Sequence, residues 1–416
     1  MSIIVAGGGI AGLTFALTCH ELGIDVRVFE AVEELKPLGV GINLQPNAVR
    51  ELFQLGLEDE LRNIGIEAEE WAMFFYGAHP IWTESRGTSA GYRWPQFSVH
   101  RGQFHLALLA AVRERLGADS VVTNARFERF EADDETVVAH FVTAQGERFQ
   151  HAADLLIGAD GIHSNVRRQI YPDEREPNWN GAIMWRGVSR AKPPRTKNSF
   201  VFVGGIAQRF ICYPVEPLDN NGETLLNWIA ELRVDEQTVD KSDWNKKAPP
   251  SAFMDKFADW DFGWLSVPDI VAKAGDIWEY PMVDRDPVDH WVEGRVALIG
   301  DAAHAMFPHG SGGATQGIVD TRVLGACLQK HGQTSAALLA YEAALLQSVN
   351  EVVVRNRSEG PVGVLFDIEA RVGAGQDVAA AIDKDAVAAF MQGYKQAAGT
   401  ARDALNKSAP LIQSGG

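Results

Sequence analysis

Cysteine is scarce in this chain of 416 residues, which holds only Cys19, Cys212 and Cys327. The three lie far apart in apolar surroundings, so they match neither the spacing of a disulfide framework nor that of a zinc site. We expect three reduced core thiols, no bound metal and a cytoplasmic location.

Positive charge is also in short supply, with 38 Lys and Arg residues against 55 Asp and Glu residues and a net charge of −17. Such a balance argues against nucleic acid and against an anionic membrane surface as partners. About 20 consecutive apolar residues are needed to span a bilayer, and we expect no apolar stretch that approaches this length. The apolar N-terminus has no basic region before it, which predicts a first strand rather than a signal peptide.

A glycine motif stands close to the N-terminus. An apolar run at residues 3–5 leads into Gly7, Gly9 and Gly12, and a helical stretch and an alternating strand then end at Glu30. Gly7 permits a tight turn, Gly9 lets the backbone approach a pyrophosphate, and Gly12 lets helix and strand pack closely. A helix N-terminus attracts phosphate, and an acid at the second strand end can accept from ribose hydroxyls. The unit therefore predicts nucleotide binding.

A second motif follows the short apolar strand expected at residues 154–158. Asp160 and Gly161 come directly after it, and Ser164 is suited to cap a helix. The Asp160 carboxylate would lie at a strand end, where α/β sheets hold ligands. Asp-Gly is equally a common turn pair, so a ligand site and a plain turn with a helix cap both stay open.

A third motif follows the strand expected at residues 295–299. Asp301 opens a segment of small residues, and Pro308 leads a glycine-rich loop into a helix that starts near Gly313. Asp301 can accept hydrogen bonds from a hydroxylated chain. The helix dipole and N–H groups at Gly313 and Ala314 suit a ring that becomes negative on reduction, such as flavin. A glycine loop that serves only packing is the alternative.

The remaining pattern divides the chain into units. Short alternating segments between polar loops predict a mainly β unit at residues 179–276. It is inserted into an α/β nucleotide-binding unit made of residues 1–178 and 277–345, and a helical segment follows at residues 346–416. The expected fold class is α/β, with a Rossmann-like nucleotide-binding domain, an inserted sheet-based substrate domain and C-terminal helices.

The order and spacing of the three motifs resemble those of the single-component FAD-dependent aromatic hydroxylases, which include the salicylate, 3-hydroxybenzoate and para-hydroxybenzoate hydroxylases. The resemblance runs from Met1 to about Arg357 and implies a para-hydroxybenzoate hydroxylase-like fold whose first domain binds FAD. It implies that Glu30 holds the adenosine ribose and that Asp301 holds the ribityl hydroxyls. The other expected FAD contacts are Gly7, Gly9, Gly12, Gly41, Arg101, Asp160, Gly161, Gly313 and Ala314.

Four further segments are similar to the 5-methylphenazine-1-carboxylate monooxygenase branch of that family. They are Leu38–Asn43, Met184–Val188, Phe257–Trp264 and Tyr280–Pro287. The flavin-side loop departs from that branch at His309 and Gly312, which leaves the ring system of the substrate open.

The resemblance implies a reaction in which NADH or NADPH reduces the flavin and O₂ then forms a C4a-hydroperoxide. One oxygen atom passes to an aromatic or N-heteroaromatic substrate, expected to be carboxylated and phenazine-like. Only one dinucleotide fingerprint is present, so the nicotinamide is expected to visit the flavin transiently. A flavin-dependent dehydrogenase or oxidase and a non-catalytic flavoprotein on the same fold are the alternatives, and a homodimer is an open option.

The substrate is expected between the flavin loop and the inserted sheet, and Arg186, Tyr213, Pro308 and His309 are the catalytic candidates. Arg186 is either a bidentate carboxylate ligand or a structural ion-pair partner. Tyr213 either stacks on the substrate ring or is a core tyrosine. His309 either accepts a phenolic proton or is a solvent-facing loop residue. The other expected lining residues are Met184, Phe202, Asn227 and Trp228.

Overall fold

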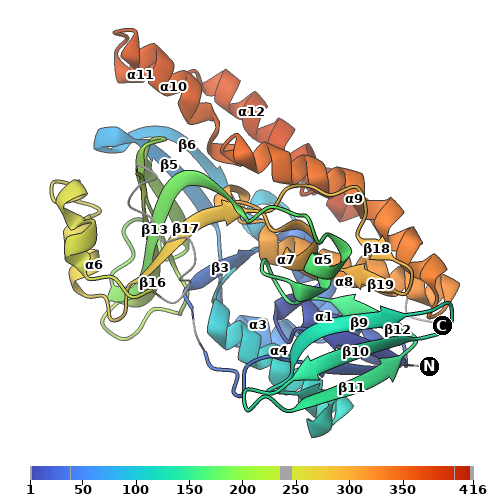
Figure 1. The fold of residues 1–416 in the computed structure, drawn as a ribbon. Helices are drawn as coiled ribbons and strands as arrows, with labels where there is room; N and C mark the ends of the chain where they lie inside the picture. Colours follow the sequence, from blue (N-terminus) through green and yellow to red (C-terminus); the bar gives the residue numbers. More distant parts are fainter. Residues whose placement is uncertain (1, 38, 235–245, 398, 413–416) are drawn as a thin grey trace.

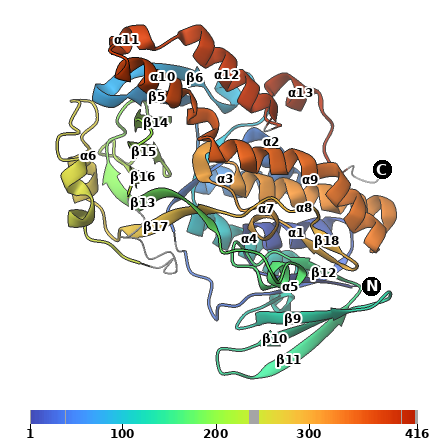
Figure 2. The same ribbon diagram turned by 45° about the horizontal axis from the view of Figure 1, so that its top comes forward.

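The computed structural model describes residues 2–37, 39–234, 246–397 and 399–412, which form two large sheets with helices around them (Figure 1 and Figure 2). Residues 235–245 of the predicted sheet-based unit and residues 413–416 of the predicted C-terminal segment lie outside the described residues.

The first large sheet contains the nucleotide fingerprint. Its strands are, in spatial order, β18 (Val292–Glu293), β19 (Val296–Leu298), β12 (Leu155–Gly158), β1 (Ser2–Ala6), β2 (Asp25–Phe29) and β8 (Val121–Val122). All neighbouring pairs are parallel except β18 with β19. Parallel sheets are usually covered on both faces, which is why these strands read as continuous apolar runs. The predicted Rossmann-like α/β class is confirmed.

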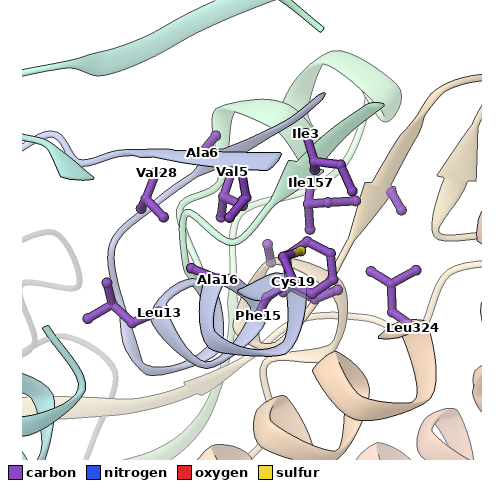
Figure 3. Packing of buried hydrophobic residues seen from close by; sticks show 14 of the residues in the cluster. Ile3, Val5, Ala6, Leu13, Phe15, Ala16, Cys19, Val28, Ile157 and Leu324 are labelled. Carbon is purple, nitrogen blue, oxygen red and sulfur yellow. The ribbon is translucent and has the colours of Figure 1, made fainter. Parts of the chain in front are cut away.

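Helix α1 (Ile10–Glu21) lies beside this sheet and packs against both α4 (Arg101–Leu116) and α8 (Gly313–His331). Side chains of α1 such as Phe15 and Cys19 point toward β1, and Leu324 of α8 lies next to them (Figure 3). Burial raises the pKa of the Cys19 thiol far above its usual range. A protonated, inert thiol is what the apolar surroundings predicted.

Two three-stranded antiparallel sheets flank the first sheet. One has the order β11 (Arg148–Ala153), β10 (Val137–Val142) and β9 (Arg126–Ala132), and the other has the order β3 (Gly41–Leu44), β7 (Phe97–His100) and β4 (Gly65–Glu67). The second of these carries Gly41 toward the site described below.

The second large sheet has seven strands, and it forms the other half of the molecule (Figure 2). Its order is β17 (Trp278–Asp284), β13 (Asn178–Ala191), β16 (Thr224–Arg233), β15 (Gln208–Pro214), β14 (Ser199–Gly204), β5 (Glu70–Phe75) and β6 (His79–Ser85). The sheet extends past residues 179 and 276, the predicted limits of the inserted unit. Strands β5 and β6, from far earlier in the chain, complete one edge, because β5 pairs in parallel with β14.

The two faces of the seven-stranded sheet pack differently. One face is covered by 3-10 turns near Phe253 and Phe257 and by α6 (Val267–Ala272), and it buries Trp228. The other face packs Met73 and Tyr213 against the C-terminal segment. Side chains alternate along each strand, so neighbouring residues of one strand serve opposite faces. Only the second face is turned toward the nucleotide-binding half.

The remaining helices are α2 (Pro46–Gln54), α3 (Glu58–Ile64), α5 (Asn165–Ile170), α7 (Asp301–His304), α9 (Ser335–Arg357), α10 (Val364–Gly373), α11 (Val378–Ala381), α12 (Lys384–Ala397) and α13 (Arg402–Lys407). Gly56, whose φ of 68° is in the left-handed region, separates α2 from α3.

Helix α9 corrects one expectation from composition. It is long and apolar enough to cross a membrane by length and hydropathy alone, although 28% of the window that meets this criterion is buried in the fold. One face of α9, which includes Leu338, Tyr341 and Val353, belongs to the buried interior. Core helices of water-soluble proteins also meet this criterion, so the helix is weak evidence for a membrane.

Candidate active site

The glycine fingerprint is built as its spacing predicts, between β1 and α1. A Cβ on Gly7 would lie 2.3 Å from the Ala159 carbonyl oxygen, and one on Gly12 would lie 2.0 Å from the Gly7 carbonyl oxygen. A Cβ on Gly9 would meet nothing within 4 Å. Gly7 and Gly12 are therefore required by packing, whereas Gly9 leaves open space where a ligand can approach the backbone.

Glu30 is fixed at the end of β2 by the fingerprint itself. Its Oε2 accepts from the Gly8 amide at 2.7 Å and its Oε1 accepts from the Val32 amide at 2.9 Å. On the other side, His105 of α4 hydrogen-bonds to the Gly8 carbonyl oxygen through Nε2 at 2.5 Å. Each carboxylate oxygen keeps a free lone pair, so Glu30 can still accept from a ribose.

Asp160 caps a helix. Its carboxylate accepts from the Ser164 hydroxyl, from the Asn165 amide at 2.7 Å and from the Val166 amide at 3.2 Å, all at the N-terminus of α5. Burial raises its pKa despite these bonds. The turn-and-cap interpretation describes the side chain, whereas Ala159 and Gly161 on either side line the cavity described below.

Asp301 begins α7 directly after Gly300, whose φ of 59° turns the chain out of β19. It lines the cavity, and its Oδ1 would be 3.8 Å from a Cβ on Gly313. The third motif thus brings its acid and its helix N-terminus together.

The short helix α7 is held by a buried ion pair. Asp320 of α8 accepts from His304 Nε2 at 2.6 Å and from the Gly300 amide at 2.8 Å. Burial opposes the imidazolium form of His304, but Asp320 and Asp301 outweigh it and raise its pKa. His304 therefore supports the turn that presents Asp301.

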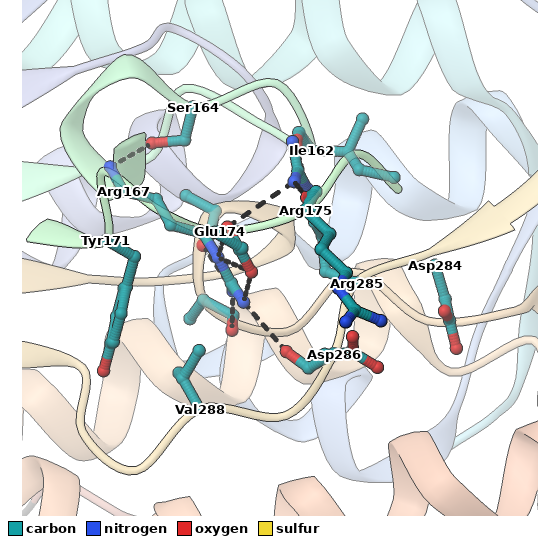
Figure 4. A network of polar contacts seen from close by, with 12 residues as sticks. Ile162, Ser164, Arg167, Tyr171, Glu174, Arg175, Asp284, Arg285, Asp286 and Val288 are labelled. Carbon is teal, nitrogen blue, oxygen red and sulfur yellow. Dashed lines mark hydrogen bonds and ion pairs between the residues drawn. The ribbon is translucent and has the colours of Figure 1, made fainter. Parts of the chain in front are cut away.

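Arg167 of α5 links the second and third motifs. It donates to the Ala302 and Ala303 carbonyl oxygens at 3.1 and 2.6 Å, and it forms an ion pair with Glu174 at 2.6 Å (Figure 4). Only 1% of the Arg167 side chain is exposed. Because α7 has a single turn, these bonds to its carbonyl groups fix the direction in which Asp301 points.

The flavin-side loop between α7 and α8 is tied to the end of α9. Asn356 donates through Nδ2 to the Phe307 carbonyl oxygen at 3.1 Å, and its own carbonyl oxygen accepts from His309 Nδ1 at 2.9 Å. Tyr394 of α12 donates to Asn356 Oδ1 at 3.0 Å and fills the space in which a Gly310 side chain would lie. Ser311 then has a φ of 51°, a strained value for a residue other than glycine.

A cavity of about 400 Å³ separates this loop from the seven-stranded sheet. Its volume suits a flavin ring with a small ligand beside it. It brings together the expected residues Gly9, Gly41, Arg101, Gly161, Arg186, Tyr213, Asp301, Pro308, His309, Gly313 and Ala314. Of the other expected cofactor contacts, Gly7, Gly12, Glu30 and Asp160 lie outside its wall.

Arg186 is a half-buried cation in the cavity wall. One of its terminal nitrogens donates to the Gly41 carbonyl oxygen at 3.0 Å, and its buried Nε has no hydrogen-bond partner. Burial lowers its pKa. In the part of the chain that the structure describes, no carboxylate lies within ion-pair distance of Arg186, so the structural ion-pair interpretation is wrong for these residues.

Gly41 is held by the sheet on both sides. Its amide donates to Asn227 Oδ1 at 2.6 Å, opposite the bond from Arg186 to its carbonyl oxygen. A Cβ there would lie 2.7 Å from Asn227 Cβ and 2.8 Å from Tyr213 Cε2. Asn227 therefore positions the loop from behind rather than lining the cavity as expected.

Tyr213 lines the cavity and stacks on Phe200, with ring centroids 4.9 Å apart and planes 14° apart. Burial raises its pKa to about 12, although Arg186 opposes the shift, so the hydroxyl is protonated at neutral pH. The expectation that Trp228 lines the substrate site is wrong. Trp228 pairs in register with Cys212, one residue before Tyr213, and alternation turns it to the opposite face.

His309 is neither solvent-facing nor free to act as a base. Only 4% of its side chain is exposed. Its Nε2 accepts from the Arg209 guanidinium at 2.9 Å, while Nδ1 faces the Asn356 carbonyl oxygen. Burial and the Arg209 charge lower its pKa, which keeps the ring neutral. Arg209 itself is paired with Glu231 and Glu359, which makes a buried charged cluster at the cavity edge.

Sequence reasoning missed several cavity residues. Trp71 and Phe200 were not expected because β5 was not assigned to this sheet, and Arg209 and Glu231 sit in apolar strands that read as core. Val362 comes from the C-terminal segment, which was not expected to reach the cavity. A row of aromatic residues at strand spacing was the available signal for Trp71.

The residues present fit FAD. Open space over Gly9 at the α1 N-terminus suits the pyrophosphate, and Asp301 beside Gly313 suits a hydroxylated chain followed by a ring at the α8 N-terminus. The cradle at Gly41 is one that a side chain would fill.

Comparison with known proteins agrees with this geometry. Residues 1–356 match the family model described as FAD binding domain. The chain is 40% identical over 361 residues to the phenazine 1,6-dicarboxylic acid hydroxylase of Lysobacter antibioticus, covering 85% of this chain and 89% of the relative. It is 32% identical to the 3-amino-4-hydroxybenzoate 2-monooxygenase of Streptomyces cremeus, covering 85% and 86%.

A solved structure has the same fold. A variant of HpxO from Klebsiella pneumoniae, complexed with FAD, superposes with a TM-score of 0.76 at 22% identity, covering 96% of this chain and 99% of that one. The family match and the two relatives extend the agreement from fold to sequence. The chain therefore belongs to the FAD-dependent aromatic hydroxylases, monooxygenases that bind FAD and use NAD(P)H.

Proposed function

We propose that this enzyme hydroxylates a small carboxylated aromatic or N-heteroaromatic molecule that lies between the seven-stranded sheet and the flavin loop. Arg186 carries the proposal, because a half-buried guanidinium whose buried Nε is unpaired needs an anionic partner in the cavity that it lines. The two relatives named above are described as acting on aromatic carboxylic acids, which supports the same class of substrate.

FAD, when bound, supplies the redox chemistry with NADH or NADPH and O₂. The chain's own residues bind and orient it. Glu30 accepts from the adenosine ribose, Arg101 meets the phosphate and ribityl region, and Asp301 accepts from the ribityl hydroxyls. The α8 N-terminus at Gly313 and Ala314 offers N–H groups to the edge of the flavin ring. The backbone of Gly41 and Gly161 lies close to the cofactor. Gly7, Gly9 and Gly12 form the pyrophosphate turn, and Asp160 acts through the helix that it caps.

The substrate ring would stack along Tyr213, with Pro308 closing the opposite side and Arg186 holding the carboxylate. We assign His309 a positioning role instead of a catalytic base, since both ring nitrogens are engaged. Its bonds to Arg209 and Asn356 hold the flavin loop at the sheet and exclude water from the cavity edge.

We further propose a cytoplasmic protein without metal, nucleic-acid or membrane partners, supported by its net charge of −17 and its buried thiols. The division into a FAD-binding unit (residues 1–178 and 277–345), a substrate unit (residues 179–276) and a helical segment (residues 346–416) stays a prediction, as does a homodimer.

Arg186→Met tests the proposed function. Loss of a charge-assisted bidentate contact should raise KM for an aromatic carboxylate about tenfold or more and leave an uncarboxylated phenol unaffected. Arg190→Met is the matched control, because Arg190 lies on the same strand but forms an exposed ion pair with Glu216. NAD(P)H oxidation, followed at varied substrate concentration, gives KM and kcat. Equal KM values for Arg186→Met and wild type would contradict the carboxylate site.

A further inference from the structure

We propose that the ring cavity has a second anion subsite, formed by Arg86 and Trp71, and that the enzyme takes an elongated planar aromatic dicarboxylate whose two acid groups reach Arg186 and Arg86. This inference rests on the proposed function, because it needs Arg186 as the first carboxylate site. It narrows the substrate of the proposed function to a class of molecule that would fill both cavities.

A smaller cavity, of about 90 Å³, adjoins the ring cavity on the side of the C-terminal helices. The two cavities share wall residues from the sheet and from the flavin loop, namely Trp71, Phe200, Met306, His309, Ser311 and Gly312. Its own wall adds Arg86, Gln96 and Lys395. A volume of this size holds a carboxyl group or a few waters, not a second ring.

One aromatic row connects the two arginines. Tyr213 lies beside Arg186 and stacks on Phe200, and Phe200 meets Trp71 edge to face with centroids 6.4 Å apart. The Arg86 guanidinium then lies 4.6 Å from the centre of the Trp71 ring. These residues come from β15, β14 and β5, which are neighbours in the sheet, and Phe200 is in direct register with Trp71. The row therefore offers a continuous aromatic wall with a guanidinium at each end.

The smaller cavity has buried donors without acceptors. Arg86 Nε and Trp71 Nε1 are buried and have no hydrogen-bond partner. The Gln96 side chain is 4% exposed, and its buried amide oxygen is also unpaired. The amide can turn by half a revolution to donate, because the two ends of an amide group have the same shape. A carboxylate in this space would satisfy these groups.

The charges of the smaller cavity favour an anion. Glu84 pairs with Arg86 at 2.8 Å and with Lys395 of α12 at 2.7 Å. Two cations against one carboxylate leave one positive charge. The other titratable wall residues are Tyr394, which burial keeps protonated, and His309, which is neutral. An anionic group on the ligand would balance this charge, as Arg186 requires at the other end.

Binding of three ligands to the holoenzyme tests the subsite, followed through the change in the flavin absorption spectrum. The probes are phenazine-1,6-dicarboxylate, its monomethyl ester and phenazine-1-carboxylate. Wild type should bind the dicarboxylate about tenfold tighter than either monoanion. Arg86→Met should remove that preference and change the affinity for phenazine-1-carboxylate less than twofold. The Arg86→Met variant keeps Glu84 paired with Lys395, and its FAD content and thermal unfolding check that it folds.

The outcomes separate the subsite from the function. Equal affinity of wild type for all three ligands overturns the subsite without any variant. A loss in Arg86→Met that is the same for monoanion and dianion overturns it too, because that result marks a structural role. If Arg186→Met binds phenazine-1-carboxylate as tightly as wild type does, the proposed function fails first and the subsite fails with it.

Discussion

Single residues at the cofactor site have roles that their local contacts explain. Gly7, Gly12 and Gly41 lie where a side chain would collide with neighbouring atoms, and Glu30 is held by the backbone of the same turn. The contacts that exclude a side chain at Gly7 and Gly41 come from residues more than a hundred positions away in sequence. The roles of Gly12 and Glu30 were predictable because their partners lie within the same short turn. The roles of Arg186 and His309 were not, because they depend on which partners the fold brings to them.

Gly12→Ala should abolish FAD retention. A Cβ at residue 12 would lie 2.0 Å from the Gly7 carbonyl oxygen, so the pyrophosphate turn must move. The flavin to protein absorbance ratio after gel filtration measures the loss. Gly393→Ala is the control, since a Cβ at that position of α12 meets nothing within 4 Å. Normal flavin content in Gly12→Ala would show that the turn is not the FAD site.

Asp301→Ala should weaken FAD binding about tenfold to a hundredfold, because hydrogen bonds from a carboxylate to ribityl hydroxyls are lost. The dissociation constant of FAD, obtained from recovery of flavin fluorescence on dilution, is the measurement. Asp255→Ala removes an exposed carboxylate that does not line the cavity, so it should leave the constant unchanged. The assignment of Asp301 does not survive an unchanged constant in the Asp301→Ala protein.

Among the elements of the fold, the flavin loop depends on partners that lie far from it in sequence. His309 joins it to Arg209 of β15, and Asn356 joins it to the end of α9. Strand order could not be predicted from sequence, because the pairing of β5 with β14 links segments more than a hundred residues apart. The helical character of the C-terminal segment was predictable, but its contact with the cavity was not, because nothing local marks it.

Arg209→Met should destabilise the protein by about 3–5 kcal/mol, because it leaves Glu231 and Glu359 buried with fewer partners. Urea unfolding of the holoenzyme gives the change. Arg148→Met breaks an exposed pair with Glu128 and should have little effect. Similar unfolding midpoints for the two variants would mean that the cluster at His309 contributes no more than a surface pair does.

Stability should depend on pH through two histidines with opposite signs. The pKa of His309 is lowered in the fold, so its contribution is present above the unfolded pKa of about 6.5 and is lost as pH falls. The pKa of His304 is raised, so its contribution is present below about 6.5 and is lost as pH rises. His309→Asn should therefore reduce the loss of stability between pH 7.5 and 5.5, whereas His304→Asn should increase it. Urea unfolding at both pH values measures the slopes, and equal slopes in the two variants would refute the assignment.

At the scale of the whole molecule, the site lies between the six-stranded sheet and the seven-stranded sheet. The seven-stranded sheet is tied to the nucleotide-binding half at Gly41, the first residue of β3. Arg186 and Asn227 of the seven-stranded sheet bind the carbonyl and the amide of that residue. The three motifs identified the cofactor half, since each repeats a known local geometry. The location of the substrate half was predictable, but most of its wall residues were not, because the wall depends on which face each strand turns inward.

Labelled oxygen tests the central claim most directly. The holoenzyme, NAD(P)H and an aromatic carboxylate that stimulates NAD(P)H oxidation are incubated under ¹⁸O₂, and the product mass is measured. Our account predicts one ¹⁸O atom in the hydroxylated product for each NAD(P)H consumed in coupled turnover. A product whose added oxygen comes from water, or a product without added oxygen, would contradict it.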